Sequence, residues 1–269
     1  IPISSLESTI KVLIKAEDSK YKLDRIHIWV NDVPIFGKTG KDVSGENTYS
    51  YSEEYSIQLS PGDNKIQISC LNEKGYESLK ETFYTEYDAK PVDPNLYLVS
   101  IGVSEYDATE YNLQYAAKDA GDISNLFKDN KKYFKKINTI EIKDKEATVP
   151  NILKAKESLK ESDINDVVVV FFAGHGLLDF DMDYYLATTD INFYDPSENG
   201  LKYDMLEDLL NDIPARKKIL FIDACHSGEV DKDEAVLEGN NENLTDTIDE
   251  RAGDQKILSQ SSFELMKHM

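Results

Sequence analysis

Two residues that could form a catalytic pair follow two strongly apolar segments of the 269-residue sequence. His175 comes shortly after the run Val167–Ala173, and Cys225 comes shortly after the run Ile219–Ile222. A cysteine thiolate is a strong nucleophile, and a neighbouring imidazole can accept the thiol proton or stabilise the anion. The backbone N–H groups of Gly176 and Cys225 are candidates for binding the oxyanion of a tetrahedral intermediate. This set of residues predicts nucleophilic attack on a carbonyl carbon.

The segments that carry this pair belong to a region in which predicted strands alternate with predicted helices. We predict strands at 96–103, 137–142, 167–173, 184–187 and 219–222, and helices at 113–127, 149–159 and 203–210. Such alternation is typical of an α/β fold, in which helices cover both faces of a mostly parallel sheet. Functional groups in these sheets lie beyond the carboxyl ends of the strands. We therefore expect His175 and Cys225 at the same rim of one sheet.

Residues 1–90 show a different pattern, with short alternating apolar segments that are separated by turn residues. Ile26, Ile28 and Val30 fall on one face of a predicted strand, and turns are predicted at 31–32 and 61–64. The pattern predicts a small all-β sandwich of immunoglobulin-like size. Two prolines in residues 91–94 predict a stiff linker, and residues 95–269 form the predicted second domain.

Composition limits the classes of function. The chain has 51 acidic and 30 basic side chains and a formal net charge of −21, which disfavours nucleic acids and anionic membranes as partners and favours cationic substrates. No apolar run is long enough to span a membrane. The two cysteines, Cys70 and Cys225, exclude a disulfide scaffold and fit a reducing, cytoplasmic compartment. They and the four scattered histidines give no zinc-binding spacing. The first residues resemble no signal peptide, and we expect the chain to be a fragment of a longer product.

The residues around the candidate pair resemble those of a known family. Segments Ala173–Gly176 and Asp223–Gly228 are similar to the histidine and cysteine boxes of caspase-like cysteine peptidases, with metacaspases and their bacterial relatives nearest and gingipain and clostripain more distant. Segments 97–103 and 116–120 extend the resemblance to roughly residues 94–262. The resemblance implies a caspase-like fold, a His175–Cys225 dyad, a thioester intermediate and no cofactor for the chemistry.

The resemblance also implies a preference for substrates. In metacaspases two acidic residues hold an arginine or lysine at P1, and they correspond to Asp119 and Asp223 here. No arginine that could receive an aspartate lies between Leu96 and Asp129. A carboxylate close to the nucleophile suits a guanidinium partner, so we expect peptide or protein substrates with a basic P1 residue. Two alternatives stay open: Asp119 could be a solvated helix residue with no role in substrate binding, and His226 could act as the base in place of His175.

The C-terminal part carries further expectations. Residues 231–254 contain nine acidic and two basic side chains and are predicted to form a loop. By resemblance this loop is often cut on activation, which makes Lys232 and Arg251 candidate self-cleavage points. Many metacaspases need calcium, and clustered carboxylates could act as ligands, although no EF-hand pattern occurs. Residues 257–262 resemble the strand that flanks the family's substrate cleft, which makes Ser261 and Ser262 candidate cleft residues.

A second class of function is a catalytically silent caspase-like interaction module within a larger scaffold. That hypothesis predicts the loss of a dyad or pocket residue, and His175, Cys225, Asp119 and Asp223 are all present. The all-β part would then, as in the peptidase hypothesis, recruit or sense a regulatory partner.

Overall fold

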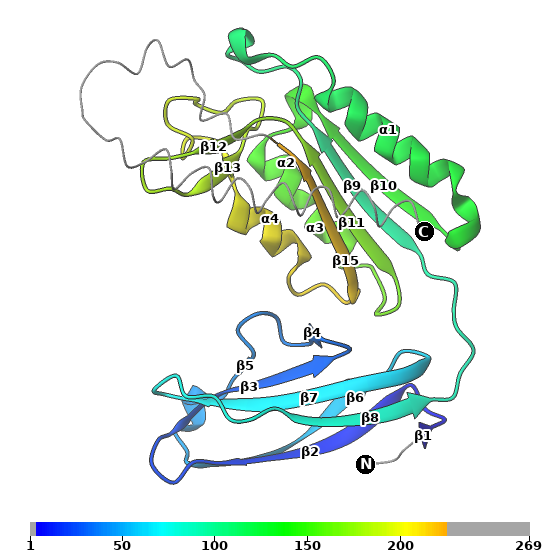
Figure 1. Cartoon of the computed structure of the whole chain (residues 1–269), viewed down its shortest axis with the longest axis vertical. Helices are drawn as coiled ribbons and strands as arrows, with labels where there is room; N and C mark the ends of the chain where they lie inside the picture. The colour runs from blue at the N-terminus through cyan, green and yellow to red at the C-terminus, as the bar shows by residue number, and fades with distance from the viewer. Residues whose placement is uncertain (1–3, 225–269) are drawn as a thin grey trace. The chain divides into compact units, whose positions relative to one another are not determined.

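The computed structural model describes residues 4–224 of the chain (Figure 1). The chain divides into two compact units, one made mainly of Ile1–Asp93 and the other mainly of the residues from Pro94 onward. Among residues 4–224, no helix has the length and apolar character needed to cross a membrane. Each unit is described by itself below.

The first unit consists of two β-sheets. Its strands are β1 (Ser4–Ser5), β2 (Thr9–Glu17), β3 (Leu23–Val30), β4 (Val33–Pro34), β5 (Lys41–Asp42), β6 (Ser50–Gln58), β7 (Gly62–Asn72) and β8 (Glu81–Tyr87), with the 3-10 turn η1 (Ser44–Glu46). One sheet has the order β1-β8-β7-β3-β4, with β5 also paired to β3, and β2 pairs with β6 in the other. Alternate side chains such as Val12, Ile28 and Ile57 form a shared buried core. The predicted all-β architecture is therefore confirmed.

The two predicted turns have different outcomes. Asn31 and Asp32 have φ angles of 54° and 67°, as a tight hairpin between β3 and β4 requires, so this turn is confirmed. The turn predicted at 61–64 is too long, because β7 already begins at Gly62. Asn64 is fully buried and its side chain bonds both the N–H and the carbonyl of Ser60, at 2.9 and 2.8 Å. Asn64, a residue type that is common in loops, thus lies in strand β7 and stabilises the preceding turn through its side chain.

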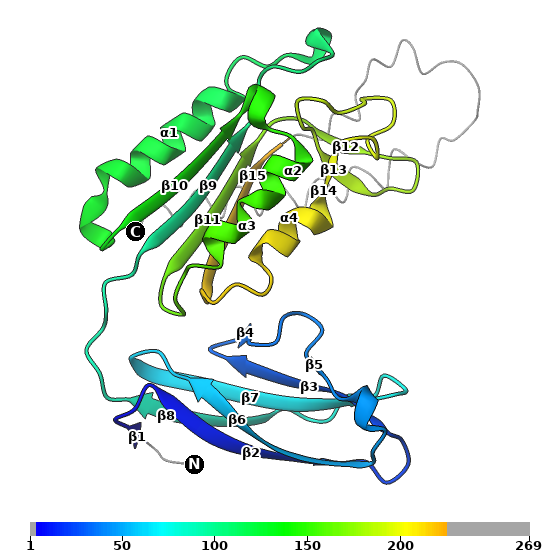
Figure 2. The ribbon, with the colours of Figure 1, turned by 180° about the vertical axis from the view of Figure 1, so that it is seen from behind.

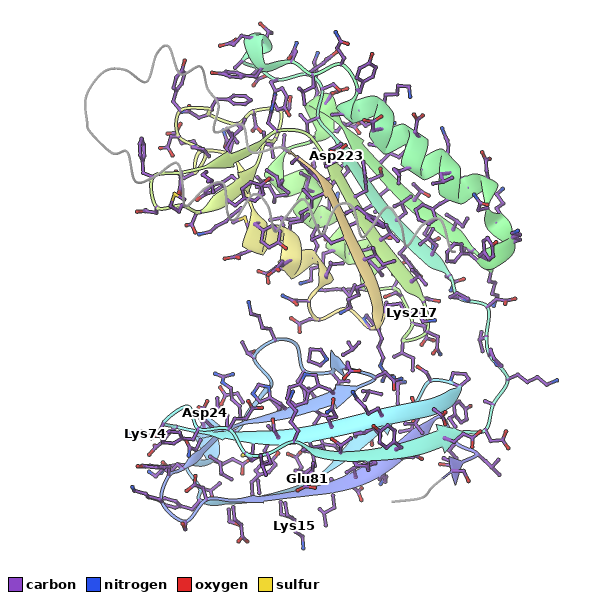
Figure 3. All side chains as sticks on the ribbon, in the orientation of Figure 1. Lys15, Asp24, Lys74, Glu81, Lys217 and Asp223 are labelled. Carbon is purple, nitrogen blue, oxygen red and sulfur yellow. The ribbon has the colours of Figure 1, made fainter. Side chains whose placement is uncertain are left out.

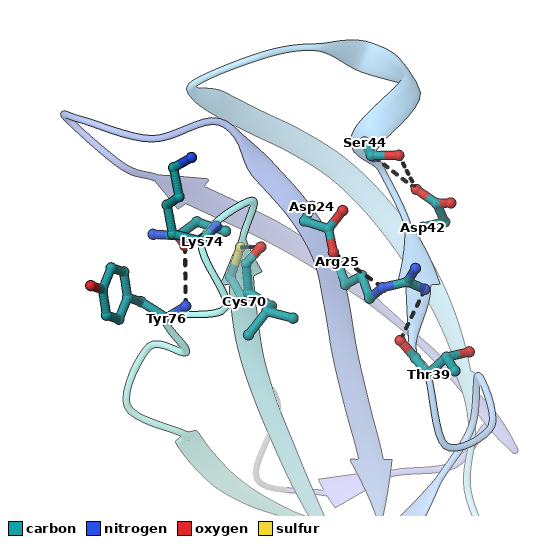
Figure 4. Close-up of polar contacts among 10 residues, drawn as sticks. Asp24, Arg25, Thr39, Asp42, Ser44, Cys70, Lys74 and Tyr76 are labelled. Carbon is teal, nitrogen blue, oxygen red and sulfur yellow. Dashed lines mark hydrogen bonds and ion pairs between the residues drawn. The ribbon is translucent and has the colours of Figure 1, made fainter.

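Cys70 lies on β7, opposite Ile26 of β3, and its half-buried side chain packs against the core of the sandwich. Burial raises the pKa of its thiol to about 11, and the negative charges of Asp18 and Asp24 act in the same direction. Figure 4 shows Cys70 together with Asp24 and Arg25 on the neighbouring strand. The thiol is protonated at neutral pH and serves as a small apolar side chain.

Within the described residues up to 224, the second unit is built around a four-stranded parallel sheet. Its elements are β9 (Leu96–Gly102), η2 (Thr109–Tyr111), α1 (Ala116–Asp129), η3 (Lys131–Tyr133), β10 (Ile137–Lys143), η4 (Asp144–Glu146), α2 (Val149–Lys154), α3 (Lys156–Leu159), β11 (Val167–Ala173), β12 (Gly176–Leu178), β13 (Tyr184–Leu186), β14 (Leu201–Lys202), α4 (Tyr203–Leu210) and β15 (Lys217–Asp223). The strand order is β10-β9-β11-β15, and β12, β13 and β14 form a small antiparallel sheet. Figures 1 and 2 show α1 on one face of the parallel sheet and α2, α3 and α4 on the other. The predicted α/β fold is confirmed.

The central strands β9 and β11 are buried along nearly their whole length, which explains their continuous apolar sequence. Leu98 and Val169 point to the face on which α1 packs, where they meet Ile123 and Phe127 of that helix. Nearer the carboxyl ends of the strands, Ala173 continues this face against α1. The packing of α1 on this face of the sheet sets the position of the helix along the strands.

Several elements differ from their sequence-based limits. The helix predicted from residue 113 begins at Ala116, since Leu113 donates its N–H to the Ser104 carbonyl and Ser104 Oγ accepts the Ala117 N–H. The helix predicted at 149–159 is divided in two at Ala155. β12 begins at Gly176, with only two residues between it and the end of β11.

Candidate active site

The candidate site lies where three parallel strands end at one rim. Gly102, Ala173 and Asp223 are paired in register as the last residues of β9, β11 and β15. Just beyond them, Val103 donates its N–H to the Ala173 carbonyl at 3.0 Å, and Gly174 donates its N–H to the Asp223 carbonyl at 3.2 Å. The backbone immediately before His175 is therefore bonded directly to the end of β15.

Three hydrogen bonds to other described residues hold His175. Its backbone N–H donates to the Tyr106 hydroxyl at 3.2 Å, its carbonyl accepts the Ala187 N–H at 2.9 Å, and its Nε2 lies 2.9 Å from the Tyr111 carbonyl oxygen. A carbonyl can only accept, so Nε2 must carry a proton. In the neutral ring Nδ1 is then the basic nitrogen, free of that proton and able to accept another.

Aromatic rings surround the half-buried imidazole. The centroids of the Tyr106, Phe193 and Tyr111 rings lie 5.3, 5.8 and 6.5 Å from that of His175, and the last two meet it edge to face. The Tyr106 hydroxyl donates to the Val103 carbonyl at 3.1 Å. Burial raises the pKa of Tyr106 to about 12, so the phenol remains protonated at neutral pH. These rings restrict the orientations open to His175.

Gly176 directly follows the histidine and begins β12. A Cβ at this position would lie 2.0 Å from the Tyr184 hydroxyl and 2.7 Å from its ring, so the close approach of Tyr184 requires glycine unless that ring moves. The structure thus accounts for this glycine by packing, while its predicted part in an oxyanion hole stays a prediction.

The two carboxylates predicted to bind a basic side chain lie on the same face of the sheet. Phe221 of β15 packs in the cluster that includes Ala116 and Ala120 of α1, and Asp223, two residues on, shares the face of Phe221. Figure 3 shows exposed Asp223 at the end of β15. Half-buried Asp119 belongs to the first turn of α1. Both carboxylates therefore belong to the α1 side of the rim.

The remaining predicted site residues lie outside the described part of the chain. They are Cys225, His226, Lys232, Arg251, Ser261 and Ser262. Among residues 4–224, no group of three or more His, Cys, Asp or Glu side chains is arranged to hold a metal ion. The calcium dependence that the resemblance implies stays a prediction.

Sequence reasoning missed the aromatic residues around His175. Tyr106 and Phe193 lie on loops and Tyr111 lies in η2; Tyr106 and Tyr111 are 69 and 64 residues from His175 in the sequence, while Phe193 follows it by 18 residues. Tyr106 and Tyr111 both lie between the strand predicted at 96–103 and the helix predicted at 113–127, and two tyrosines on one predicted loop could have served as a signal. Phe193 offers no comparable pattern.

Comparisons with known proteins bear on this unit. The family profile described as the caspase domain matches residues 97–266. Among solved structures, a protein of Geobacter sulfurreducens is 23% identical with a TM-score of 0.40, over 51% of this chain and 53% of that protein. The fibronectin(III)-like modules of Clostridium thermocellum CbhA are 16% identical with a TM-score of 0.23, over 32% of this chain and 89% of that one. The chain thus spans about half the length of the Geobacter protein, and no curated protein matches.

The profile match includes the strands that end at the rim, the histidine segment and the cysteine segment. It covers more than half of the 269 residues. The chain belongs to the caspase domain family of cysteine peptidases.

Proposed function

We propose that this protein is a cysteine endopeptidase that cleaves after arginine or lysine through a dyad of His175 and Cys225. The observation that carries the proposal is the pairing of strand ends beside the histidine. The residue before His175 is bonded to Asp223, and Cys225 follows Asp223 by two residues, a length of chain that spans at most about 7 Å. This short length of chain supports the proposed pairing of the Cys225 thiol with the imidazole.

The proposed reaction uses His175 Nδ1 as the general base. Nδ1 accepts the Cys225 proton, and the thiolate attacks the carbonyl carbon of the scissile bond. The N–H groups of Gly176 and Cys225 would bind the oxyanion of the tetrahedral intermediate. Its collapse breaks the C–N bond, the imidazolium gives its proton to the leaving amine, and a thioester remains. A water molecule that loses its proton to Nδ1 then hydrolyses the thioester and restores the thiol.

The protonated Nε2 supports this assignment of roles. Its bond to the Tyr111 carbonyl leaves Nδ1 as the nitrogen that exchanges protons. The carbonyl dipole also stabilises the positive charge that the ring carries after it takes the thiol proton. Positive charge on His175 would in turn favour the Cys225 thiolate.

A basic P1 side chain would bind to the carboxylates of Asp119 and Asp223. Support comes from their common side of the rim and from the net charge of −21, which raises the local concentration of cationic peptides. Charge-assisted hydrogen bonds to each carboxylate would select a guanidinium or ammonium group over neutral or acidic side chains.

Hydrolysis of matched fluorogenic peptides that end in Arg, Lys or Asp tests this function. Turnover of the Arg and Lys peptides is expected, with loss in Cys225→Ala and a fall of about 100- to 10,000-fold in His175→Ala. Asp119→Asn and Asp223→Asn should lower kcat/KM for the basic peptides about 10- to 100-fold. Asp129→Asn removes an exposed carboxylate at the far end of α1 and is the matched control.

The assay should be repeated with calcium, and the products should be searched by mass spectrometry for self-cleavage after Lys232 and Arg251. Turnover that persists in Cys225→Ala would exclude the proposed nucleophile. Absence of turnover of every peptide, with or without calcium, would favour the interaction module instead.

A further inference from the structure

We propose that Phe193 is a positioning residue for His175. Its ring, stacked on Tyr111, holds the Tyr111 carbonyl where that carbonyl fixes the protonated Nε2 of the imidazole. The proposal rests on the His175–Cys225 dyad proposed above and adds to it a residue from the loop that follows β13.

Phe193 contacts each of the other rings in the cluster. Its centroid lies 3.8 Å from that of Tyr111 at an interplanar angle of 13°, and it meets Tyr106 and His175 nearly edge to face at 5.3 and 5.8 Å. The side chain is only 9% exposed. Both stacked and edge-to-face pairs are favourable for aromatic rings. Phe193 therefore couples the position of Tyr111 to that of His175.

The backbone that carries the Tyr111 carbonyl is held by local hydrogen bonds, such as the one from the Tyr111 N–H to the Ala108 carbonyl at 3.1 Å, and by the packing of the Tyr111 ring. It belongs to η2, a single 3-10 turn of three residues whose ends have no side-chain cap. Thr109 and Glu110 are exposed. Such short turns have weaker hydrogen-bond geometry than an α-helix. Packing of the Tyr111 ring against Phe193 therefore adds a restraint on the carbonyl that His175 uses.

The loop that carries Phe193 is itself anchored beside the site. Thr189 accepts the Asp107 N–H at 2.9 Å through its carbonyl, and its hydroxyl donates to the Glu105 carbonyl at 2.8 Å. Directly before Phe193, Asn192 donates its N–H to the Glu198 carbonyl at 3.1 Å, which joins the two ends of the segment that carries Phe193. These bonds hold the Phe193 ring against the segment that contains Tyr106 and Tyr111. The ring can therefore restrict the movement of Tyr111 and of the His175 imidazole.

Loss of this ring should let the Tyr111 carbonyl move and the imidazole turn. A displacement of about 1 Å in a catalytic group can cost about 100-fold in rate. Phe193→Leu keeps an apolar side chain but removes the stack, so we expect kcat for an Arg peptide to fall at least about tenfold with KM changed less than about threefold. Phe193→Tyr keeps the ring and should retain kcat within about threefold. Tyr194→Leu removes a neighbouring ring that is 77% exposed and should change neither constant.

Two readouts separate positioning from mere loss of folding. Rates are taken per Cys225 thiol titrated, and the pH dependence of Cys225 alkylation by iodoacetamide is measured in a Cys70→Ala background. A shift of the Phe193→Leu alkylation profile towards that of His175→Ala supports the proposal. In ¹⁵N-histidine-labelled protein, the His175 Nε2 proton should exchange with solvent faster in Phe193→Leu than in the wild type.

The outcomes distinguish this proposal from the proposed function. Wild-type kcat, alkylation profile and Nε2 proton exchange in Phe193→Leu would overturn the role of Phe193 while the dyad stands. Identical alkylation profiles in wild type and His175→Ala would overturn the dyad. The exchange of the Nε2 proton would still test whether Phe193 holds the Tyr111–His175 bond.

Discussion

The Tyr106 hydroxyl connects the ends of two neighbouring strands at the candidate site. It donates to the Val103 carbonyl beyond β9 and accepts the N–H of His175 beyond β11. The buried phenol, with a pKa of about 12, stays protonated at neutral pH and can make both bonds at once. At the scale of single residues, the backbone of His175 thus depends on a side chain that is 69 residues away in the sequence.

Tyr106→Phe should lower the free energy of unfolding by about 1–3 kcal/mol, since the partly buried N–H of His175 and the buried carbonyl of Val103 both lose their partner. Urea denaturation at neutral pH gives this value. Tyr194→Phe, which removes an exposed hydroxyl, should stay within about 0.5 kcal/mol of the wild type. Equal stabilities for the two variants would contradict the role given to the Tyr106 hydroxyl.

The sequence predicts some of these residues and not others. His175 and Asp223 were placed at strand ends because each follows a continuous apolar run, which is a local pattern. Tyr111 lies 64 residues from His175 and contributes through its backbone carbonyl. Every residue type has such a carbonyl, so the sequence does not reveal this contact. Phe193 is an ordinary buried aromatic residue in composition. Its contacts arise only when the loops are folded together.

At the scale of elements, the first turn of α1 is placed by the absence of a side chain on β9. A Cβ at Gly102 would lie 2.3 Å from the Ala116 carbonyl oxygen and 2.7 Å from Ala120 Cβ. Helix and strand therefore approach more closely than any other residue would permit. This contact sets the position of Asp119, one turn along the helix from Ala116.

Gly102→Ala should push the start of α1 away from the sheet and destabilise the protein by about 1–3 kcal/mol. If the variant is folded, KM for an Arg peptide should also rise, because Asp119 moves with the helix. Gly45→Ala is the control, since a Cβ at Gly45 meets nothing within 4 Å. Urea denaturation should give a lower free energy of unfolding for Gly102→Ala than for Gly45→Ala. Equal values would refute the claim that α1 and β9 are too close for a side chain at residue 102.

Glu141 links β10 to α1 and shows how the same contact depends on pH. Hydrogen bonds from Lys143 and Lys128, supported by their positive charge, lower the pKa of Glu141 to about 2. The stabilisation is full above the unfolded-state pKa of about 4.3 and is lost as the pH falls towards 2. Glu141→Gln should therefore flatten the decline in unfolding free energy across this range. Glu157→Gln, at an exposed glutamate of α3, should leave the decline unchanged.

The bounds of elements with a continuous apolar run were predicted closely. The bounds of elements that depend on contacts with residues distant in the sequence were not. β11 has the predicted limits of Val167 and Ala173. The start of α1 was wrong by three residues because Ser104, outside the helix, bonds its first turn. No element was predicted over Glu81–Tyr87, although Phe83 and Tyr87 of this strand, β8, pack against the core. Its frequent polar residues concealed the alternation.

At the scale of the whole molecule, the excess of 21 negative charges should influence which substrates arrive. Charges of one sign raise the local concentration of oppositely charged ligands and speed their association. The effect weakens with salt, because the Debye length falls from about 30 Å at 0.01 M to about 8 Å at 0.15 M ionic strength.

For an Arg peptide of positive net charge, kcat/KM should fall several-fold over this range of ionic strength while kcat changes little. The physical reason is that screening slows encounter but leaves the acyl transfer itself unaffected. An Arg peptide with flanking glutamates, of negative net charge, should show a rise instead. Parallel responses of the two peptides would show that the charge of the molecule does not steer its substrates.

The proposal that His175 activates Cys225 is tested most directly by covalent trapping with a peptidyl-arginine chloromethyl ketone and intact-mass measurement. We predict a single adduct, mapped by peptide sequencing to Cys225, that forms at least about 100-fold more slowly in His175→Ala. An aspartyl analogue should react far more slowly than the arginyl one. Modification of Cys225 at the same rate with and without the imidazole would contradict the dyad.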